Sequence, residues 1–311
     1  MKARKKYSGV IVPLMTPFTG ELTVDAASVA RLTSHVIAGG GQPFILGTTG
    51  EGPSVPAGER KRMVAETVKA AAGKALVYAG ISGNCLADAV EEGKLFHELG
   101  ADVLVATMPS YYPSDSSQTL RYFEALADRL PAPLIIYNIP ATTHLSIPVE
   151  TAEKLSHHPN IAGMKDSEKG EERIVACAKL WKDRPDFSFL CGWAVMSSAA
   201  IAQGADGIVP SSGNLAPAVY RALYDAAVEG NRSLASRAQE KADKVSETYQ
   251  KGRTLNYSLA AFKAILAAYG LCGPAMLPPL YRLAAEEESR LQQEVLEIWQ
   301  DLETVNAVQQ D

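Results

Sequence analysis

Short apolar runs alternate with longer amphipathic runs along most of the chain. The short runs are apolar at successive positions, which is typical of parallel strands covered on both faces. The longer runs have helical spacing, and the clearest extends from Pro56 to Ala72, opens with Pro and is followed by Gly73. Strands are predicted at Gly9–Met15, Pro43–Leu46, Ala75–Ile81, Asp102–Thr107, Leu134–Asn138, Ile161–Lys165, Phe187–Cys191 and Gly207–Pro210.

The number and order of these elements predict the fold. Eight strands that alternate with eight helices indicate a (β/α)8 barrel, in the α/β class. A doubly wound open sheet is the alternative, but it favours six strands and a Gly-rich turn after the first strand. Here Thr16-Pro17-Phe18-Thr19-Gly20 follows the first strand and lacks the G-x-G-x-x-G spacing. Besides Pro56–Ala72, helices are predicted at Ser28–Ala38, Leu86–Leu99, Gln118–Arg129, Val149–Ser156, Glu171–Lys182, Ala194–Ala202 and Pro217–Val228.

The last part of the chain has a different pattern. No strand pattern follows residue 230, and helices are predicted at Ser233–Lys251, Tyr257–Tyr269 and Ala284–Val305. No low-complexity linker separates these helices from the barrel. We therefore predict a barrel with the active site in residues 1–230 and a helical extension packed on it in residues 231–311.

Composition narrows the classes of partner. The 311 residues carry a formal charge of −5, and without a basic surface a nucleic-acid partner is not expected. No apolar stretch approaches the roughly 20 residues that cross a bilayer, and Val10–Leu14 is too short for a signal-peptide core. The expected location is the cytoplasm. The four scattered cysteines are predicted to be buried thiols, and no metal-binding pattern or cofactor is expected.

Lys165 is the most informative candidate for chemistry. Active sites of such barrels lie at the carboxyl ends of the strands, and Lys165 ends the apolar run Ile161-Ala162-Gly163-Met164. Burial lowers the pKa of a lysine and favours the neutral amine. A neutral amine attacks a ketone to give an iminium, which withdraws electrons from the adjacent carbon. The alternative is a solvated lysine paired with Asp166.

Other candidates lie at the ends of neighbouring strands. Tyr137 ends the preceding strand and could relay protons beside Lys165, although a core tyrosine would give the same pattern. Thr48 and Thr49 stand between glycines and offer hydroxyl and backbone N–H groups to a carboxylate. Glu51 either supports that turn or is an acid at a helix N-terminus. Gly192 and Ser211, after the last two strands, complete the candidate set.

Together these residues resemble the dihydrodipicolinate synthase and N-acetylneuraminate lyase family of pyruvate-dependent class I aldolases. The resemblance implies a lyase on a (β/α)8 barrel, usually a homotetramer built from tight dimers. It implies Lys165 as Schiff-base former, Tyr137 as proton shuttle and Thr48 as a link between two tyrosines. It also implies that Thr48 and Thr49 hold the pyruvoyl carboxylate and that Tyr111 reaches into the neighbouring subunit's site. The matching motifs are Pro13–Phe18, Gly47–Glu51, Pro109–Pro113, Tyr137–Pro140, Gly163–Ser167 and Gly204–Gly207.

Two departures from the family pattern bear on the substrate. Thr142 stands where dihydrodipicolinate synthases carry an arginine that binds the partner aldehyde's carboxylate, and losing such a contact costs about 1.5–3 kcal/mol. Ala194-Val195 stand where neuraminate lyases carry an Asp-Glu pair. The resemblance therefore favours cleavage of a 2-keto-3-deoxy sugar acid into pyruvate and an aldehyde. Alternatives are 4-hydroxy-tetrahydrodipicolinate synthase, N-acetylneuraminate lyase, a silent keto-acid-binding barrel and a metal-dependent aldolase.

Overall fold

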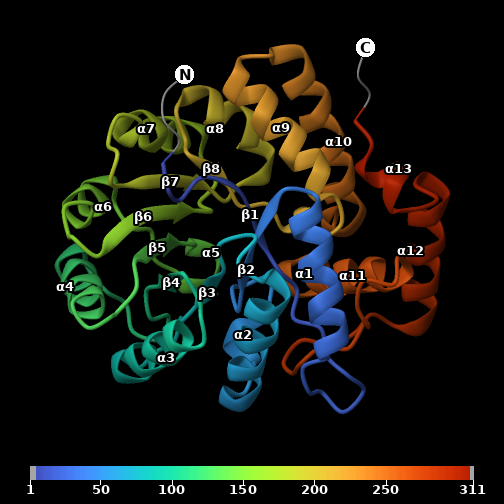
Figure 1. Ribbon diagram of the computed structural model, residues 1–311, viewed down its shortest axis with the longest axis horizontal. Coiled ribbons are helices and arrows are strands. Elements are labelled where there is room, and N and C mark those ends of the chain that lie inside the picture. Colours follow the sequence, from blue (N-terminus) through green and yellow to red (C-terminus); the bar gives the residue numbers. More distant parts are fainter. Residues whose placement is uncertain (1–4, 309–311) are drawn as a thin grey trace.

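The computed structural model describes residues 5–308 as a closed barrel of eight parallel strands. Each strand pairs with the next in the chain, and the eighth closes on the first, so the predicted (β/α)8 barrel is confirmed (Figure 1). The strands are β1 (Gly9–Pro13), β2 (Gly41–Ile45), β3 (Tyr78–Gly80), β4 (Val103–Thr107), β5 (Leu134–Asn138), β6 (Ile161–Asp166), β7 (Ser188–Cys191) and β8 (Gly207–Ile208).

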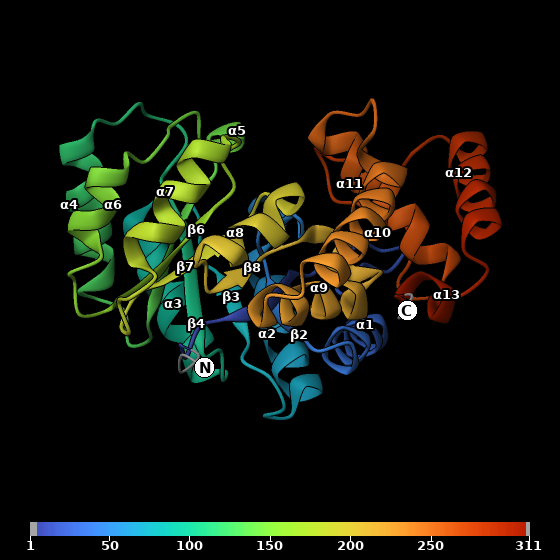
Figure 2. The same cartoon turned by 90° about the horizontal axis from the view of Figure 1, so that it is seen from above.

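Helices surround the strands (Figures 1 and 2). Most of them follow one strand and lead to the next, as the alternating pattern predicts. They are α1 (Ala26–Ala38), α2 (Ala57–Ala71), α3 (Leu86–Glu98), α4 (Ser116–Ala127), α6 (Val149–Leu155), α7 (Glu171–Trp181), α8 (Ser197–Gln203) and α9 (Pro217–Glu229). Four short turns lie between them: η1 (Gly52–Ser54), α5 (Pro140–Thr143), η2 (Ala194–Met196) and η3 (Ser211–Asn214).

The strands are apolar on both faces because they separate two cores. In β4, Val103 and Val105 point into the barrel, whereas Leu104 and Ala106 pack against the surrounding helices. This alternation follows from the two-residue period of a strand. Polar side chains at the carboxyl end of a strand are thus directed either into the barrel or into the helical layer.

The C-terminal residues form helices, with one difference from the prediction. They are α10 (Arg232–Gln250), α11 (Leu255–Ala268), α12 (Ala285–Ile298) and α13 (Leu302–Asn306), and α10 packs against α9 (Figure 1). The single helix predicted over Ala284–Val305 is wrong, because Asp301 accepts a hydrogen bond from the Thr304 backbone N–H and begins a new helix. The division at residue 230 stays a prediction, and residues 1–4 and 309–311 at its ends lie outside the described range.

Further details differ from the prediction, and the first and last strands end at Pro13 and Ile208, before the predicted Met15 and Pro210. β2 ends before Leu46, whose φ of 58° is incompatible with a strand. β3 is shorter than the predicted Ala75–Ile81, and the turn α5 was not predicted. Cys85 is exposed, whereas the other three cysteines are buried as expected. Among residues 5–308, no helix combines the length and apolar character needed to cross a membrane.

Candidate active site

Lys165 lies inside the barrel at the end of β6. Its side chain is 5% exposed, and its amine lies 3.7 Å from the centre of the Tyr137 ring and 4.9 Å from that of Phe44. Burial lowers the pKa of this amine, and Tyr137 opposes only part of the effect. The ring faces alone would favour the ammonium, but desolvation outweighs them. The structure therefore holds an amine that loses its proton more readily than a lysine in water.

Asp166 does not pair with Lys165, because adjacent residues of a strand face opposite ways. The Asp166 carboxylate accepts from Arg173 Nε at 2.7 Å and from Asn138 Nδ2 at 2.9 Å. Arg173 also donates to the Ile147 carbonyl at 2.7 Å, and Asn138 Oδ1 accepts from the Ile147 N–H at 3.0 Å. The solvated Lys165–Asp166 pair is thus excluded. This outer network instead fixes the loop after β5 against the end of β6.

Tyr137 is positioned by its neighbours on both sides. Its backbone is in register with Lys165 across β5 and β6, which brings the two side chains together on the inner face. The Ser167 hydroxyl lies 3.4 Å from the Tyr137 hydroxyl and donates to it. Gly192 leaves room for Ser167, because a Cβ at residue 192 would lie only 2.2 Å from Ser167 Oγ. A side chain at residue 192 would therefore displace Ser167, which contacts Tyr137.

The turn that carries Thr48 and Thr49 lies beside this group. Thr49 is buried, and its hydroxyl donates to Ser211 Oγ at 3.3 Å, which joins the ends of β2 and β8. A Cβ at Gly47 would lie 2.9 Å from the Phe44 ring, the ring that also faces the Lys165 amine. Close packing of Gly47 on Phe44 thus places the turn next to the lysine.

A buried ion pair ties the same turn to the C-terminal helices. Lys263 of α11 and Glu51 form a salt bridge in which both side chains are completely buried. The Lys263 amine also donates to the Ala275 carbonyl at 2.7 Å, and Glu51 Oε2 accepts from the Leu277 N–H at 2.9 Å. Glu51 makes no side-chain capping bond to η1, so its role is to support the turn rather than to cap a helix.

A cavity of about 320 Å³ opens at the same end of the barrel, and we call it the mouth cavity. Thr48 and Thr142 line it, and each follows a strand whose side chains contact the Lys165 amine. Its other polar lining residues are Glu51, Ser54 and Asn256. The remaining lining residues are apolar and come from η1, α11 and the segment before α12: Pro53, Leu255, Leu259, Pro279 and Leu280.

Tyr111 is exposed, in contrast to Lys165, Tyr137 and Thr49. Its ring is 76% exposed and meets Tyr112 edge to face at 5.0 Å. The loop that carries it is held by Asn84, which accepts from the backbone N–H groups of Ser110 and Tyr111. Tyr111 is therefore fixed near the end of β4 with its side chain directed to solvent.

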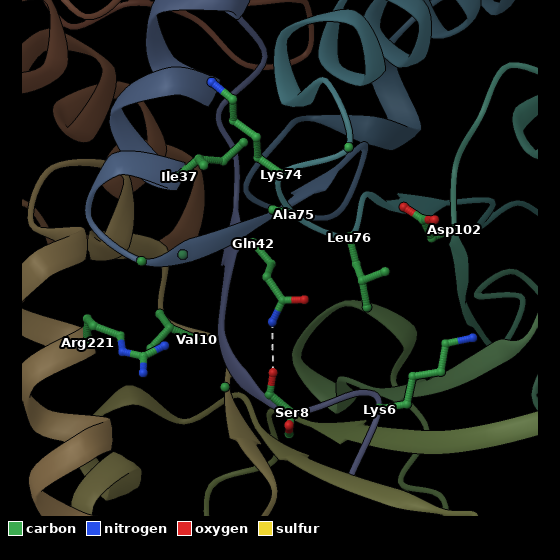
Figure 3. Close-up of a pocket in the computed structure, with 14 residues that line it drawn as sticks. Lys6, Ser8, Val10, Ile37, Gln42, Lys74, Ala75, Leu76, Asp102 and Arg221 are labelled. Carbon is green, nitrogen blue, oxygen red and sulfur yellow. Dashed lines mark hydrogen bonds between the residues drawn. The ribbon is translucent and has the colours of Figure 1, made fainter. Parts of the chain in front are cut away.

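A larger cavity, of about 600 Å³, lies at the opposite end of the barrel (Figure 3). It adjoins the amino ends of β1 and β2, where the Gln42 amide donates to the Ser8 carbonyl at 2.7 Å. Arg221 lines it but donates to both oxygens of Asp225. In these barrels the amino-terminal end serves stability rather than chemistry, so we place the candidate active site at the other end.

The sequence did not identify Phe44, Ser167 and Lys263 as parts of the site. Lys263 gave a usable signal, because it is the single charged residue in the apolar run Leu259–Leu266. Phe44 gave none, and Ser167 was noted only as the end of the Gly163–Ser167 motif, because the contacts of both residues depend on register across the barrel. Within the described part of the chain, no group of three or more His, Cys, Asp or Glu side chains is placed to hold a metal ion.

Fold and site together define a (β/α)8 barrel with a buried lysine and tyrosine at the carboxyl ends of adjacent strands. A family model, that of the dihydrodipicolinate synthetase family, matches residues 6–298. The chain belongs to this family, whose members are pyruvate-dependent lyases and synthases, so the predicted family and enzyme class are confirmed.

Individual relatives agree with this assignment. The chain is 31% identical over 295 residues to a 4-hydroxy-tetrahydrodipicolinate synthase of Limosilactobacillus fermentum, covering 91% of this chain and 89% of that protein. The solved dihydrodipicolinate synthase of Bacteroides thetaiotaomicron is 30% identical, with a TM-score of 0.89 over 95% of this chain and all of that one. YagE, a prophage protein of this family from E. coli K12, was solved in complex with pyruvate. It is 26% identical, with a TM-score of 0.87 over 94% of this chain and 98% of that one.

Proposed function

We propose that this protein is a class I aldolase in which Lys165 forms a Schiff base with pyruvate and makes or cleaves a carbon–carbon bond to an aldehyde. The observation that carries the proposal is the buried Lys165 amine, 3.7 Å from the Tyr137 ring centre and with a lowered pKa. A neutral amine is the nucleophilic form, and a nearby phenol can exchange protons with it. The pyruvate held by the related YagE supports the choice of keto acid.

In the synthetic direction, the Lys165 nitrogen attacks C2 of pyruvate to give a carbinolamine, which loses water and becomes an iminium. The iminium then loses a C3 proton to become an enamine. The enamine C3 forms a bond to the aldehyde carbon, and the aldehyde oxygen takes up a proton. Water hydrolyses the new iminium, releasing a 4-hydroxy-2-keto acid and the free lysine. The water consumed equals the water released, and the proton gained by oxygen equals that lost from C3.

The residues around Lys165 would transfer protons and bind the substrate. Tyr137, held by Ser167, would relay the protons at C3 and at the aldehyde oxygen. Thr48, Thr49 and Ser211 would offer hydroxyl groups to the keto-acid carboxylate, with Thr49 and Ser211 already in contact. Thr142 would face the aldehyde-derived part of the substrate, because it lines the mouth cavity.

The aldehyde partner distinguishes the candidate reactions. The departures at Thr142 and Ala194-Val195 support the 2-keto-3-deoxy sugar acids that the sequence favours, in the direction of cleavage. The name of the Limosilactobacillus fermentum relative favours a second candidate, the condensation of pyruvate with aspartate semialdehyde. Selective turnover of aspartate semialdehyde over other aldehydes would establish the second candidate and reject the first.

The covalent step has a direct test. The protein is incubated with pyruvate, reduced with borohydride and analysed by intact and peptide mass spectrometry. We expect one adduct, located on Lys165 and lost in Lys165→Ala. The matched control is Lys169→Ala, which removes an exposed lysine four positions along the same segment and should retain the adduct. An unmodified wild-type mass would reject the proposal.

Assembly and location remain predictions from the family resemblance and the sequence. We propose a homotetramer of tight dimers in which the exposed Tyr111 enters the neighbouring subunit's site. Sedimentation analysis of the protein and of Tyr111→Phe, together with the kcat of both, would test this. A monomer with full activity would reject it. A cytoplasmic location is likewise proposed, and fractionation of cells that express the protein would check it.

A further inference from the structure

We infer that the mouth cavity binds an apolar substituent of the aldehyde partner, so the preferred substrates are 4-hydroxy-2-keto acids with a hydrocarbon or aromatic tail. The inference rests on the proposed Schiff-base reaction with pyruvate and concerns the identity of its aldehyde partner. It departs from the polyhydroxylated sugar acid that the sequence favours. The observations that carry it are the chemistry, size and position of the cavity.

The cavity offers no charge to a polar substrate. None of the described residues that line it is a lysine, arginine or histidine. Its single carboxylate, Glu51, is neutralised by Lys263 and also accepts from the Leu277 N–H. A carboxylate or phosphate on the aldehyde would therefore find no basic side chain in this lining to pair with.

Only four of its described lining residues are neutral and polar, and two of these are already bonded within the protein. The Thr142 hydroxyl donates to the Ile139 carbonyl at 3.4 Å, and Asn256 Oδ1 accepts from Thr254 at 2.6 Å. A sugar chain carries a hydroxyl on nearly every carbon, and each would need a partner when buried. The leucine and proline side chains that form half of the lining cannot supply them.

The size of the cavity suits a ring or a short hydrocarbon chain. Its volume is about 320 Å³, whereas an engineered apolar cavity of about 150 Å³ holds benzene. Ligand sites of this kind are mostly apolar, with a few polar groups that fix orientation. Thr48 and Ser54 also line the cavity and carry hydroxyl groups that can serve this purpose.

The lining of the cavity also adjoins the segments that surround Lys165. One wall comes from the turn after β2, whose Gly47 packs on Phe44, and Phe44 contacts the Lys165 amine. The facing wall comes from α5, which begins three residues after Tyr137. Both α5 and α11 lie towards the same side of the molecule in Figure 2. When the C3–C4 bond forms, the tail on C4 can extend from the lysine between these walls onto Leu255 and Leu259 of α11.

The test compares aldehydes of different polarity with pyruvate as the common partner. Hexanal and benzaldehyde represent apolar partners, whereas glyceraldehyde and succinic semialdehyde represent hydroxylated and charged ones. We expect kcat/KM to be on the order of tenfold or more higher for the apolar pair, since one methylene group in an apolar pocket changes it by about 10-fold to 200-fold. Equal or reversed preference would overturn the inference.

Two variants locate the effect in the mouth cavity. Leu255→Ser removes a 46% exposed leucine at the rim and should lower kcat/KM for hexanal several-fold, while leaving the borohydride-trapped pyruvate adduct intact. Leu180→Ser is the matched control, because Leu180 is 44% exposed on α7 and outside this lining. Thr142→Arg introduces a cation and should shift preference from hexanal towards succinic semialdehyde.

The outcomes separate this inference from the proposed function. A missing pyruvate adduct would reject the Schiff-base mechanism itself. A normal adduct with no turnover of apolar aldehydes would overturn only the inference about the cavity. If Leu255→Ser changed the oligomeric state and left aldehyde preference unchanged, the cavity would be a subunit contact, and the inference would again be overturned.

Discussion

The buried Lys263–Glu51 pair gives the sharpest prediction about stability. Replacing Lys263 with Met removes the basic partner of Glu51 and leaves a carboxylate sealed from water. Breaking a buried pair from one side costs about 3–5 kcal/mol. That is a large part of the roughly 5–15 kcal/mol by which a typical protein is stable. We therefore expect Lys263→Met to lower the free energy of unfolding by about 3–5 kcal/mol.

Equilibrium urea unfolding at neutral pH, followed by circular dichroism, measures this change. The control is Lys94→Met, which breaks an exposed pair with Glu91, 2.9 Å long, and should cost at most about 1 kcal/mol. Adding Glu51→Gln to Lys263→Met removes the stranded charge and should recover much of the loss, because Gln can still accept from the Leu277 N–H. A Lys263→Met loss no larger than that of Lys94→Met would refute the reasoning.

Three further predictions concern the site. Lys165→Met should stabilise the fold at neutral pH, by about 1.4 kcal/mol for each unit by which burial lowers the lysine pKa. The unfolded chain holds this proton up to the ordinary pKa of 10.5, so the gain should vanish as pH rises towards that value in thermal melts. Gly192→Ala should displace Ser167 and lower kcat roughly tenfold to hundredfold, with the pyruvate adduct retained; an unchanged kcat would contradict the contact. Thr49→Val should raise the KM for pyruvate roughly tenfold by removing a hydroxyl from a carboxylate site, and an unchanged KM would assign Thr49 a structural role only.

The fold could be predicted from sequence because its signals are local. Apolar runs, helical spacing and the flanking Gly and Pro residues each report on a few neighbouring positions. Errors arose where one side chain or one dihedral angle decides a boundary, as at Leu46 and at Asp301, which begins a second helix. Neither the strand end at Leu46 nor the helix start at Asp301 alters the apolar pattern, so the pattern does not predict them.

Only part of the site could be predicted from the sequence, because several of its contacts join residues that are far apart along the chain. Lys165 and Tyr137 could be placed together because adjacent parallel strands align their carboxyl ends, and the structure brings them into contact. The bond between Glu51 and Lys263 joins residues 212 positions apart. Nothing local to either residue specifies its partner. The apolar character of the mouth cavity was hidden for the same reason, since its leucines come from α11, far from the strands in sequence.

The opposite orientations of Lys165 and Asp166 on β6 have a consequence for how such a site can change. Lys165 faces Tyr137 inside the barrel, where the proposed reaction takes place, whereas Asp166 faces outward and binds Arg173. Lining residues can therefore be replaced, in natural divergence or in a designed library, without disturbing the frame that supports them. New specificities should be sought by varying alternate positions at the strand ends, with the intervening residues kept constant.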